Sequence, residues 1–371
     1  MKLSVDPAAF AAALGAAARL SLKVSPVPPI TCVRLDVNPG GLDITATDYD
    51  AWLEQTIPVT APAESMGRGI CVPAHALQRF VGGLTGAGEV RLEVQGTRAK
   101  VSQGNSSATF AALPADDFPL FQGRETGATA KLALPVAVLL DLFKRTVPAA
   151  SDDEFRQDIA GVHLRLTDGA LVASTFDGKM MCRQGIKVTA AALPTVTVPT
   201  KTAQMLVQLL PKSGEALAVL DPAWIGFHAG PVTLTSRVQG GAFPNLDIVI
   251  PKDLATHAEI DPTGLRLALW RLIGLSTQPK PRVDIAFADG EMVLTSGDKS
   301  PLHEGREAVP TTGRGPACKR RVDARLLLNA ARCAGGRLGL ATADDLSQMS
   351  DRLVLTDSGD SGWLSVLATA A

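Results

Sequence analysis

The residues that come closest to a catalytic motif are Gly359-Asp-Ser-Gly362, which resemble the nucleophile segment of a serine protease. Such a serine needs a general base, and the chain offers His75, His163, His228, His257 and His303. A hydrolase nucleophile lies on a strand-turn-helix elbow, however, and no such pattern surrounds Ser361. Gly, Asp and Ser together are typical of turns. We therefore interpret the motif as a turn and predict no catalytic residue.

Patterns for binding phosphate or metal are equally weak. The run Gly82-Gly-Leu-Thr-Gly-Ala-Gly88 follows a predicted helix, whereas a phosphate loop opens one. No His or carboxylate group has metal-ligand spacing, and the five cysteines contain no Cys-x-x-Cys pair. We therefore expect no metal, no other cofactor and no disulfide framework. Free thiols suit a reducing cytoplasm, where we expect the protein to work.

Basic side chains are concentrated on six helix-like runs, although the net charge of the chain is −1. With their capping residues, and with Lys212 just after the fourth run, they hold ten of 36 basic but four of 37 acidic residues. A face shared by all six runs would be basic and would suit a polyanion. The alternative is that Lys and Arg are common on any exposed helix face. The runs are 7–20, 73–84, 135–147, 199–210, 262–275 and 323–334.

These runs recur with one period, which indicates an internal triplication. At intervals of 128 and 127 residues, the first helices begin at Pro7, Pro135 and Pro262. At intervals of 126 and 124, the second helices begin at Pro73, Pro199 and Asp323. Strand-like stretches end at intervals of 129 and 121 in Asp48, Asp177 and Asp298, and two Phe-Pro pairs lie 125 apart, at Phe118 and Phe243. We predict three similar domains, over residues 1–122, 128–252 and 257–371.

Each repeat has the pattern of strand, helix, three strands, helix and three strands. Alternation of apolar and polar residues marks the strands, for instance Leu42–Thr47 and Gly161–Leu166. Helices spaced evenly among many strands are typical of an α+β fold, with helices on one face of antiparallel sheets. The third repeat departs in its middle. Residues 301–321 are rich in Gly, Pro and charge, and we expect a loop or poor strands there.

The alanine-rich start of the chain could be taken for the apolar part of a secretory signal. Only Lys2 precedes it as a basic residue, however, and Asp6 followed by Pro7 is a good helix cap and first helical residue. We therefore expect a helix from Pro7 to Leu20. Elsewhere the chain has no run of about 18 apolar residues, so we expect no membrane-spanning helix.

Several segments, in order along essentially the whole chain, resemble the β subunit of bacterial DNA polymerase III, the sliding clamp. They are Met1-Lys-Leu-Ser-Val5, Leu42-Asp-Ile-Thr-Ala-Thr-Asp48, residues 110–119, Val198-Pro-Thr-Lys-Thr202 and residues 235–244. The resemblance is strong in the first two repeats and weak in the third. A single Thr-Asp or Phe-Pro pair would mean nothing, but together with the threefold repeat the segments are specific.

The resemblance implies a head-to-tail homodimer whose six similar domains form a closed ring, with helices lining the hole and sheets outside. Duplex DNA would pass through the hole without being read for sequence, because phosphate contacts position but do not specify. The ring would hold a DNA polymerase on its template, as a non-catalytic processivity factor served by clamp-loader subunits. This arrangement would also explain why the helices are basic.

On the same resemblance, DNA would be contacted by cations of the helices and of one loop. The loop before Pro26 would approach DNA with Lys23, and Lys201 matches a basic position on a hole-lining helix. The helices add Arg79, Lys144, Arg145, Arg266 and Arg325. The segment Asp152–Gln157 matches a DNA-facing loop but begins with three acidic residues, which weakens the expected contact.

The family also has a hydrophobic groove, between its second and third domains, that takes short peptide motifs from polymerases and the loader. The matching positions are Ile159, Gly178, Lys179, Met180, Met181, Pro244, Ile248 and Val249. Methionine suits a groove that accepts varied peptides, although these methionines could instead belong to the core. The family's C-terminal Met-Pro-Met-Arg pattern is replaced by Val366-Leu-Ala-Thr-Ala-Ala371, which indicates altered partner motifs.

For the contact between two copies we predict an apolar seam closed by strand pairing, with Phe110 from the first repeat and Ile273 and Leu275 from the third. Each of these could instead be internal core. Besides the replication clamp and the hydrolase, a third hypothesis is a clamp-fold scaffold that dimerises and binds partner peptides but loads poorly on DNA. The acidic segment and the unfamiliar C-terminus motivate it.

Overall fold

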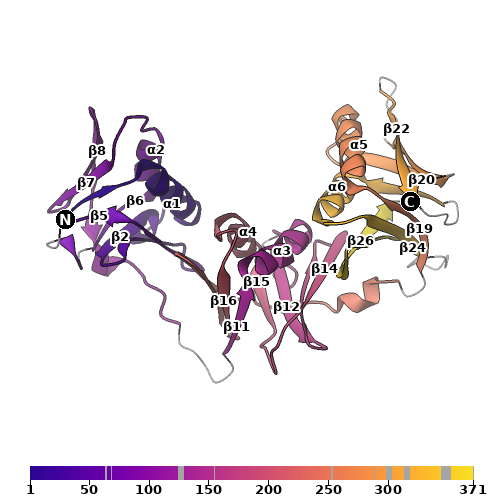
Figure 1. Ribbon diagram of the computed structural model, residues 1–371, viewed down its shortest axis with the longest axis horizontal. Coiled ribbons are helices and arrows are strands. Elements are labelled where there is room, and N and C mark those ends of the chain that lie inside the picture. The colour runs from indigo at the N-terminus through magenta and orange to yellow at the C-terminus, as the bar shows by residue number, and fades with distance from the viewer. Residues whose placement is uncertain are drawn as a thin grey trace. The chain divides into compact units, whose positions relative to one another are not determined.

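A computed structural model describes most of the chain (Figure 1). The described residues are 1–62, 65–67, 69–123, 129–153, 155–251, 254–288, 290–297, 303–312, 318–343 and 352–370. Glu154 of the acidic segment and Asp298 of the third strand marker lie outside them.

The order of elements recurs three times along the described chain. The first series is β1 (Lys2–Val5), α1 (Pro7–Leu20), β2 (Cys32–Asn38), β3 (Gly41–Thr47), β4 (Ala51–Ile57), β5 (Val59–Thr60), β6 (Gly69–Pro73), α2 (Ala74–Gly82), β7 (Val90–Gln95), β8 (Arg98–Gln103), β9 (Ser106–Ala111) and β10 (Leu113–Pro114). The second is β11 (Ala130–Pro135), α3 (Val136–Thr146), β12 (Gly161–Thr167), β13 (Ala170–Phe176), β14 (Met180–Lys187), β15 (Val196–Pro199), α4 (Thr200–Leu209), β16 (Glu215–Leu220), β17 (Trp224–Ala229) and β18 (Val232–Arg237). The third is β19 (Leu254–Ile260), α5 (Pro262–Leu275), β20 (Arg282–Ala288), β21 (Glu291–Ser296), β22 (Arg306–Thr312), β23 (Cys318–Asp323), α6 (Ala324–Cys333), β24 (Leu338–Ala343), β25 (Arg352–Asp357) and β26 (Asp360–Ala370).

Helices α1 and α5 begin and end as the sequence predicts. Their N-caps, Asp6 and Asp261, accept the N–H groups of Ala9 at 2.8 Å and Thr263 at 3.0 Å. A proline follows each cap, and its ring holds φ at a helical value where no N–H is needed. Local chemistry therefore defines these helix starts.

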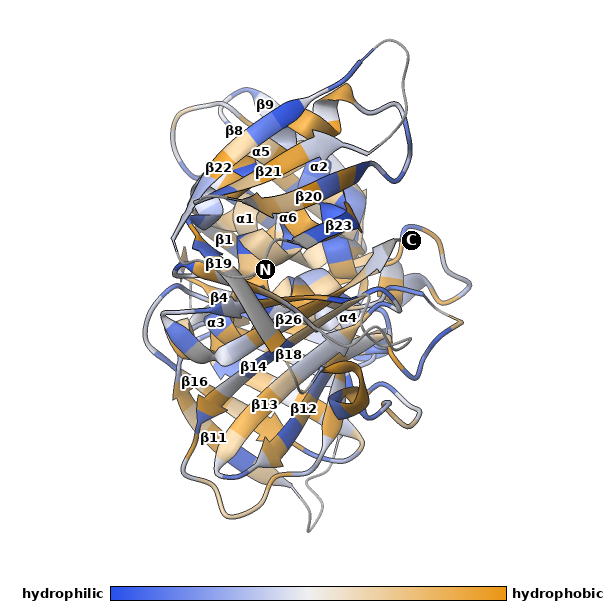
Figure 2. Cartoon of the chain, turned by 90° about the vertical axis from the view of Figure 1, so that its right-hand side faces the viewer, coloured by the Kyte–Doolittle hydropathy of each residue, from blue (hydrophilic) through white to orange (hydrophobic). Residues whose placement is uncertain are grey.

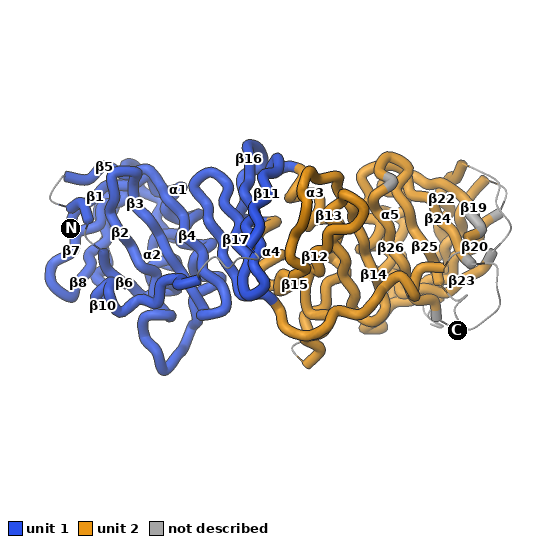
Figure 3. The backbone as a smooth tube through the Cα atoms, turned by 90° about the horizontal axis from the view of Figure 1, so that it is seen from below, with its two compact units in different colours: residues 1–137, 208–238 blue, residues 138–207, 239–371 orange. Residues whose placement is uncertain are grey.

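The chain separates into two compact units (Figure 3). Unit 1 comprises residues 1–137 and 208–238. It contains a five-stranded sheet, β5-β1-β7-β8-β9, and a nine-stranded sheet, β10-β6-β2-β3-β4-β18-β17-β16-β11. All these pairings are antiparallel, and α1 packs against α2 and over β3 and β4. The junction of β4 with β18 joins strands of the first and second series, with Trp52 opposite Thr235.

Unit 2 comprises residues 138–207 and 239–371. Its strands form one twelve-stranded sheet, β15-β12-β13-β14-β26-β23-β20-β21-β22-β19-β24-β25, in which β26 also pairs with β25. The junction of β14 with β26 joins strands of the second and third series, with Met181 opposite Val366. Hydrophobic and hydrophilic residues alternate along β12 (Figure 2). Val162 and Leu164 are buried there, and Arg165 is exposed.

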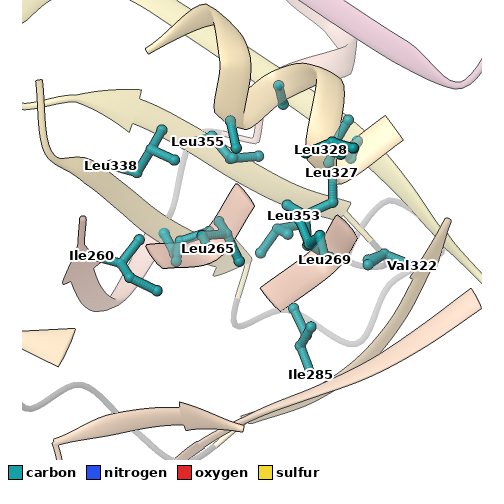
Figure 4. Close-up of a cluster of buried hydrophobic side chains, with 14 of the residues drawn as sticks. Ile260, Leu265, Leu269, Ile285, Val322, Leu327, Leu328, Leu338, Leu353 and Leu355 are labelled. Carbon is teal, nitrogen blue, oxygen red and sulfur yellow. The ribbon is translucent and has the colours of Figure 1, made fainter. Parts of the chain in front are cut away.

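The main core of unit 2 lies between its helices and its sheet. Helices α5 and α6 pack on each other, and Leu265, Leu269 and Leu327 point from them toward Ile285 and Leu353 of the strands (Figure 4). All five side chains are at most 1% exposed. Burying a side chain of this size stabilises a fold by about 1.5 to 3 kcal/mol.

The expectation of a loop or poor strands over residues 301–321 is wrong for much of that stretch. Strand β22 pairs with β21, and β23 pairs with β20 over six residue pairs. Neighbouring strands supply backbone hydrogen bonds that local composition does not forecast. Strand β6 was also not predicted, because its residues directly precede the helix start at Pro73.

Candidate DNA and peptide interfaces

Five of the seven predicted DNA-binding side chains are exposed: Lys23 after α1, Arg79 on α2, Lys144 on α3, Lys201 on α4 and Arg325 on α6. Arg266 on α5 is half-buried, and its Nη2 donates to Thr263 Oγ1 at 3.1 Å. Positive charge near the end of a helix is also favoured by the helix dipole, which applies to Arg79 and Lys144.

Arg145 has a structural role in unit 2. Its side chain is 12% exposed, and its Nη1 lies 2.8 Å from Oδ2 of Asp357, whose side chain is fully buried. The Asp357 carboxylate also accepts the N–H groups of Gly335 at 2.8 Å and Gly359 at 2.9 Å. Burial alone would raise the pKa of Asp357, but these hydrogen bonds and Arg145 hold it below its ordinary value. Arg145, which the resemblance assigned to DNA, therefore holds unit 2 together, and we do not propose that it contacts DNA.

Lys201 lines a cavity together with an acidic residue. Asp152 and Lys201 line one cavity of about 480 Å³, together with residues that include Ser151, Gln157, Gln204 and Gln239. In the same segment, Arg156 forms an exposed ion pair with Asp158 at 3.1 Å. The described part of this segment therefore adds little positive charge next to Lys201.

Gly178 and Lys179 form the turn between β13 and β14. Gly178 has a φ of +93°, a conformation that favours glycine. Asp177 Oδ1 accepts the N–H groups of Lys179 at 2.8 Å and Met180 at 2.7 Å. The carbonyl of Lys179 accepts the N–H of Ala368 at 2.8 Å. The turn thus presents the exposed Lys179 at the start of the β14–β26 junction.

The two methionines that follow have different surroundings. Met180 is fully buried in the main core of unit 2, so core packing describes it. Met181 is 1% exposed and belongs to a separate apolar cluster with Leu246, Val354 and Val366. Val249 packs against that cluster from its rim. We call Met181, Leu246, Val249, Val354 and Val366 the groove cluster.

The segment from Phe243 to Val249 borders the groove cluster and is held to the sheet by polar contacts. Asp247 Oδ1 lies 2.7 Å from Arg183 Nη2. Arg352 Nη1 donates to the Val249 carbonyl at 2.5 Å. Between these contacts Ile248 is 66% exposed, so one predicted groove residue is open to a ligand. Pro244 is half-buried, whereas Ile159 is 2% exposed.

An aromatic contact supports the start of the same segment. The rings of His163 and Phe243 stack with centroids 4.4 Å apart and planes 3° from parallel. His163 Nδ1 lies 3.0 Å from Thr197 Oγ1. Burial lowers the pKa of His163 to about 4, so its ring is neutral at pH 7.

The sequence reasoning missed Leu246, Val354 and Val366 as members of the groove cluster. For Val354 and Val366 the sequence did contain an indication, because residues 352–356 and 363–367 have the pattern of strands. No pattern, however, indicated which predicted strand would lie beside Met181.

The predicted contact residues between copies lie in separate units. Phe110 is half-buried on β9, the edge strand of the five-stranded sheet, with its ring 6.0 Å from that of Phe80. On α5, Ile273 packs against the core of unit 2 and Leu275 is 39% exposed.

Within the described ranges, no three His, Cys, Asp or Glu side chains are grouped as metal ligands would be. Gly359 lies in the turn between β25 and β26, as the sequence predicts, whereas residues 360–362 already belong to β26. The side chains of Ser361 and His257 lie outside the described ones. Across the described helices, none is long and apolar enough to cross a membrane.

Comparison with known proteins agrees with this architecture. The chain is 28% identical over 306 residues to the beta sliding clamp of Caulobacter vibrioides, covering 80% of both proteins. It is 26% identical over 341 residues to that of Pseudomonas putida, covering 91% of this chain and 88% of the relative. A crystal structure of the Bartonella birtlesii sliding clamp bound to griselimycin matches with a TM-score of 0.85 at 22% identity, over the whole of both chains. The predicted α+β clamp fold is therefore confirmed.

Two family models match the chain. Residues 1–122 match the N-terminal domain of the DNA polymerase III beta subunit, and residues 133–245 match its central domain. These segments together span more than half of the chain, so the protein belongs to the DNA polymerase III beta subunit family.

Proposed function

We propose that this protein is a DNA sliding clamp, a non-catalytic processivity factor of the cytoplasm. Two copies would close head to tail into a ring around duplex DNA. Each copy would contribute three clamp domains, over residues 1–122, 128–252 and 257–371. The observation that carries the proposal is the family match, because relatives named beta sliding clamp are similar over most of their length.

The repeated strand order supports closure into a ring. Strand β18 pairs with β4, and β26 pairs with β14, so the last strand of one series twice joins the fourth strand of the series before it. Strand β9 holds the place of β18 and β26 in the first series, and β22 holds the place of β4 and β14 in the third. Pairing of β9 with β22 of a second copy would repeat the junction and cover Phe110, with Ile273 and Leu275 as candidate neighbours.

The exposed cations support passage of DNA. Lys23, Arg79, Lys144, Lys201 and Arg325 are all exposed, and four of them lie on helices. Contacts of single Lys and Arg side chains with phosphates are sequence-independent and individually weak, which suits sliding. Arg266 could add a sixth contact at the surface of α5.

The groove cluster supports capture of a polymerase or clamp-loader peptide. Val249 offers apolar contact over the buried Met181, and Ile248 and Lys179 are exposed. An apolar floor with an adjacent cation suits a peptide that carries a large apolar side chain and an acidic one. Residues Gly178 and Pro244 would shape the two ends of the groove.

A second candidate function is a clamp-fold scaffold that binds peptides but loads poorly on DNA. Asp152 favours it, because it lines the same cavity as Lys201 and its carboxylate reduces attraction for phosphate there. The C-terminal residues after Val366 also differ from the family pattern.

The test is retention on DNA. The chain is incubated with its clamp loader, ATP and nicked circular DNA, and bound protein is separated by gel filtration. A clamp stays on the circle and is lost when the circle is cut, because a ring slides off a free end. Retention by neither form, from a chain that is a dimer in solution, would select the scaffold. A monomer at micromolar concentration would reject the ring.

Charge reversal sharpens the test. The double variant Lys144→Glu and Lys201→Glu should reduce the amount loaded on circles about fivefold or more, since it replaces two phosphate contacts with repulsion. The matched control is Lys100→Glu on β8, which is exposed but lies on a strand. The control should load like the unchanged chain.

A further inference from the structure

Unit 1 contains a turn built like the one beside the groove cluster. Asp48 Oδ1 accepts the N–H groups of Asp50 at 3.1 Å and Ala51 at 2.9 Å, as Asp177 does for Lys179 and Met180. The Asp50 carbonyl accepts the N–H of Arg237 at 2.8 Å, as the Lys179 carbonyl does for Ala368. Trp52 on β4 therefore holds the place that Met181 holds on β14.

Aromatic rings gather at this place. The ring of Phe121 lies between those of Trp52 and Trp224, with centroids 5.1 Å and 5.3 Å away. Trp52 Nε1 donates to the Pro119 carbonyl at 2.9 Å, which ties the segment that carries Phe121 to β4. Trp52 is 5% exposed, whereas Phe121 and Trp224 are half-buried and present part of their rings to solvent.

Two exposed side chains lie close in sequence to these rings. Tyr49, in the turn three residues before Trp52, is 38% exposed, and Leu120, directly before Phe121, is 44% exposed. We call Tyr49, Trp52, Leu120, Phe121 and Trp224 the aromatic patch. Aromatic residues that are anchored on one side and exposed on the other are typical of binding surfaces.

The backbone conformation at Tyr49 also supports a binding role for this surface. Tyr49 has a φ of +74°, in the left-handed region, whereas the equivalent residue in unit 2 is Gly178 with a φ of +93°. A bulky residue is disfavoured there and glycine is not. Strain of this kind is concentrated at functional sites, which agrees with a binding role for the Tyr49 side chain.

The turn beside the aromatic patch is more acidic than the turn beside the groove cluster. Asp50 is exposed at its tip, where the unit 2 turn carries the exposed Lys179. The exposed Arg237, opposite Trp224 on β18, offsets only one of the two carboxylates of Asp48 and Asp50. A ligand of the aromatic patch would therefore be favoured by a basic residue and disfavoured by an acidic one.

We propose that the aromatic patch is a second peptide-docking site, which takes a short extended segment with a leucine or aromatic side chain next to a lysine or arginine. The comparison with the groove cluster rests on the proposed function. The test needs neither DNA nor a loader, so its failure would leave the sliding-clamp proposal standing, and failure of that proposal would not affect this measurement.

The experiment uses the full chain labelled with 5-fluorotryptophan, followed by ¹⁹F NMR. The chain has four tryptophans, and single Trp→Phe variants assign their signals. The probes are two synthetic peptides, acetyl-KLFKG-amide and acetyl-DLFDG-amide. We expect KLFKG to shift the Trp52 and Trp224 signals with a Kd at least about fivefold lower than DLFDG.

Variants taken from the repeat make the result specific. Tyr49→Gly copies unit 2 at a position where glycine relieves strain, and it should weaken KLFKG binding at least about fivefold while the chain stays folded. Asp50→Lys should reverse the preference toward DLFDG. Leu217→Ser alters another exposed apolar side chain of unit 1 and should change neither the affinity for KLFKG nor the preference between the two peptides. The proposal is overturned if neither peptide shifts the Trp52 and Trp224 signals, or if Tyr49→Gly binds KLFKG as well as the unchanged chain does. It is also overturned if the unchanged chain binds DLFDG better than KLFKG.

Discussion

The β4–β18 junction of unit 1 and the β14–β26 junction of unit 2 have the same backbone pairing but different side-chain chemistry. In unit 1 the neighbouring contacts are the rings of Trp52, Phe121 and Trp224. In unit 2 they include the buried ion pair of Arg145 with Asp357. Backbone hydrogen bonds preserve a repeated strand order, and the side chains beside each junction are free to diverge. The two junctions thus offer different surfaces to partners.

A second pair of positions differs in the same way. Arg34 on β2 binds both carboxylate oxygens of Asp36, at 2.7 and 3.0 Å, and donates to the Ala115 carbonyl at 3.2 Å. The equivalent residue on β12 is His163, which stacks on Phe243. In the first repeat the charged Arg34 side chain holds the segment at Ala115. In the second repeat the neutral His163 ring holds the segment at Phe243.

The largest effect that we expect comes from breaking the buried ion pair. Arg145→Ala would leave the Asp357 carboxylate buried without its cation and should lower the free energy of unfolding by about 3 to 5 kcal/mol. Arg34→Ala should lower the free energy of unfolding by only about 1 kcal/mol, because Arg34 and Asp36 both keep access to water. Urea denaturation of each variant measures the difference. Equal losses would show that the two ion pairs do not differ in their contribution to stability.

A smaller effect follows from His163. The unfolded imidazole takes up a proton at its ordinary pKa of 6.5, whereas the folded one does so near 4. The unfolded state therefore binds more protons in this window, and the stability contributed above pH 6.5 is lost as the pH falls from 6.5 to 4. The unfolding free energy should fall by about 1 to 2 kcal/mol more in the unchanged chain than in His163→Gln.

Denaturation series at pH 7, 6, 5 and 4 provide the measurement. Carboxylates such as Asp357, whose pKa is lowered, contribute stability that is lost only at the acidic end of this range. They are present in both chains, so the difference isolates His163. If the unfolding free energies of the unchanged chain and of His163→Gln fall in parallel with pH, the lowered pKa of His163 is contradicted.

The smallest effect concerns the two turns. Gly178→Ala should lower the unfolding free energy by about 1 kcal/mol, because only its φ is unsuitable for alanine. A Cβ there would meet no atom within 4 Å. Tyr49→Gly should raise stability by up to about 1 kcal/mol by relieving strain. Thermal denaturation of both variants would detect opposite shifts, and a loss in Tyr49→Gly would mean that its ring stabilises the fold.

Parts of the candidate sites were predictable from local patterns. The turn of Gly178 and Lys179 follows a strand that ends in Asp177, and the short side chain of aspartate caps such turns. The buried Met180 was not separable from Met181 by sequence, since neighbours on a strand face opposite sides and nothing in the pattern says which side holds a groove. The acidic partner of Arg145 lies 212 residues away, beyond any local signal.

The sequence by itself determined the triplication, the helix starts at Asp6 and Asp261 and the concentration of basic residues on helices, because capping, periodicity and charge are local properties. Only the tertiary structure decided that β22 and β23 are strands, that Arg145 belongs to a buried ion pair and that Phe121 lies between two tryptophans. Each of these depends on a partner that is distant in sequence and is brought close by strand pairing, within the third repeat for β22 and β23 and across repeats for Arg145 and Phe121. Such pairing follows from the packing of the whole unit.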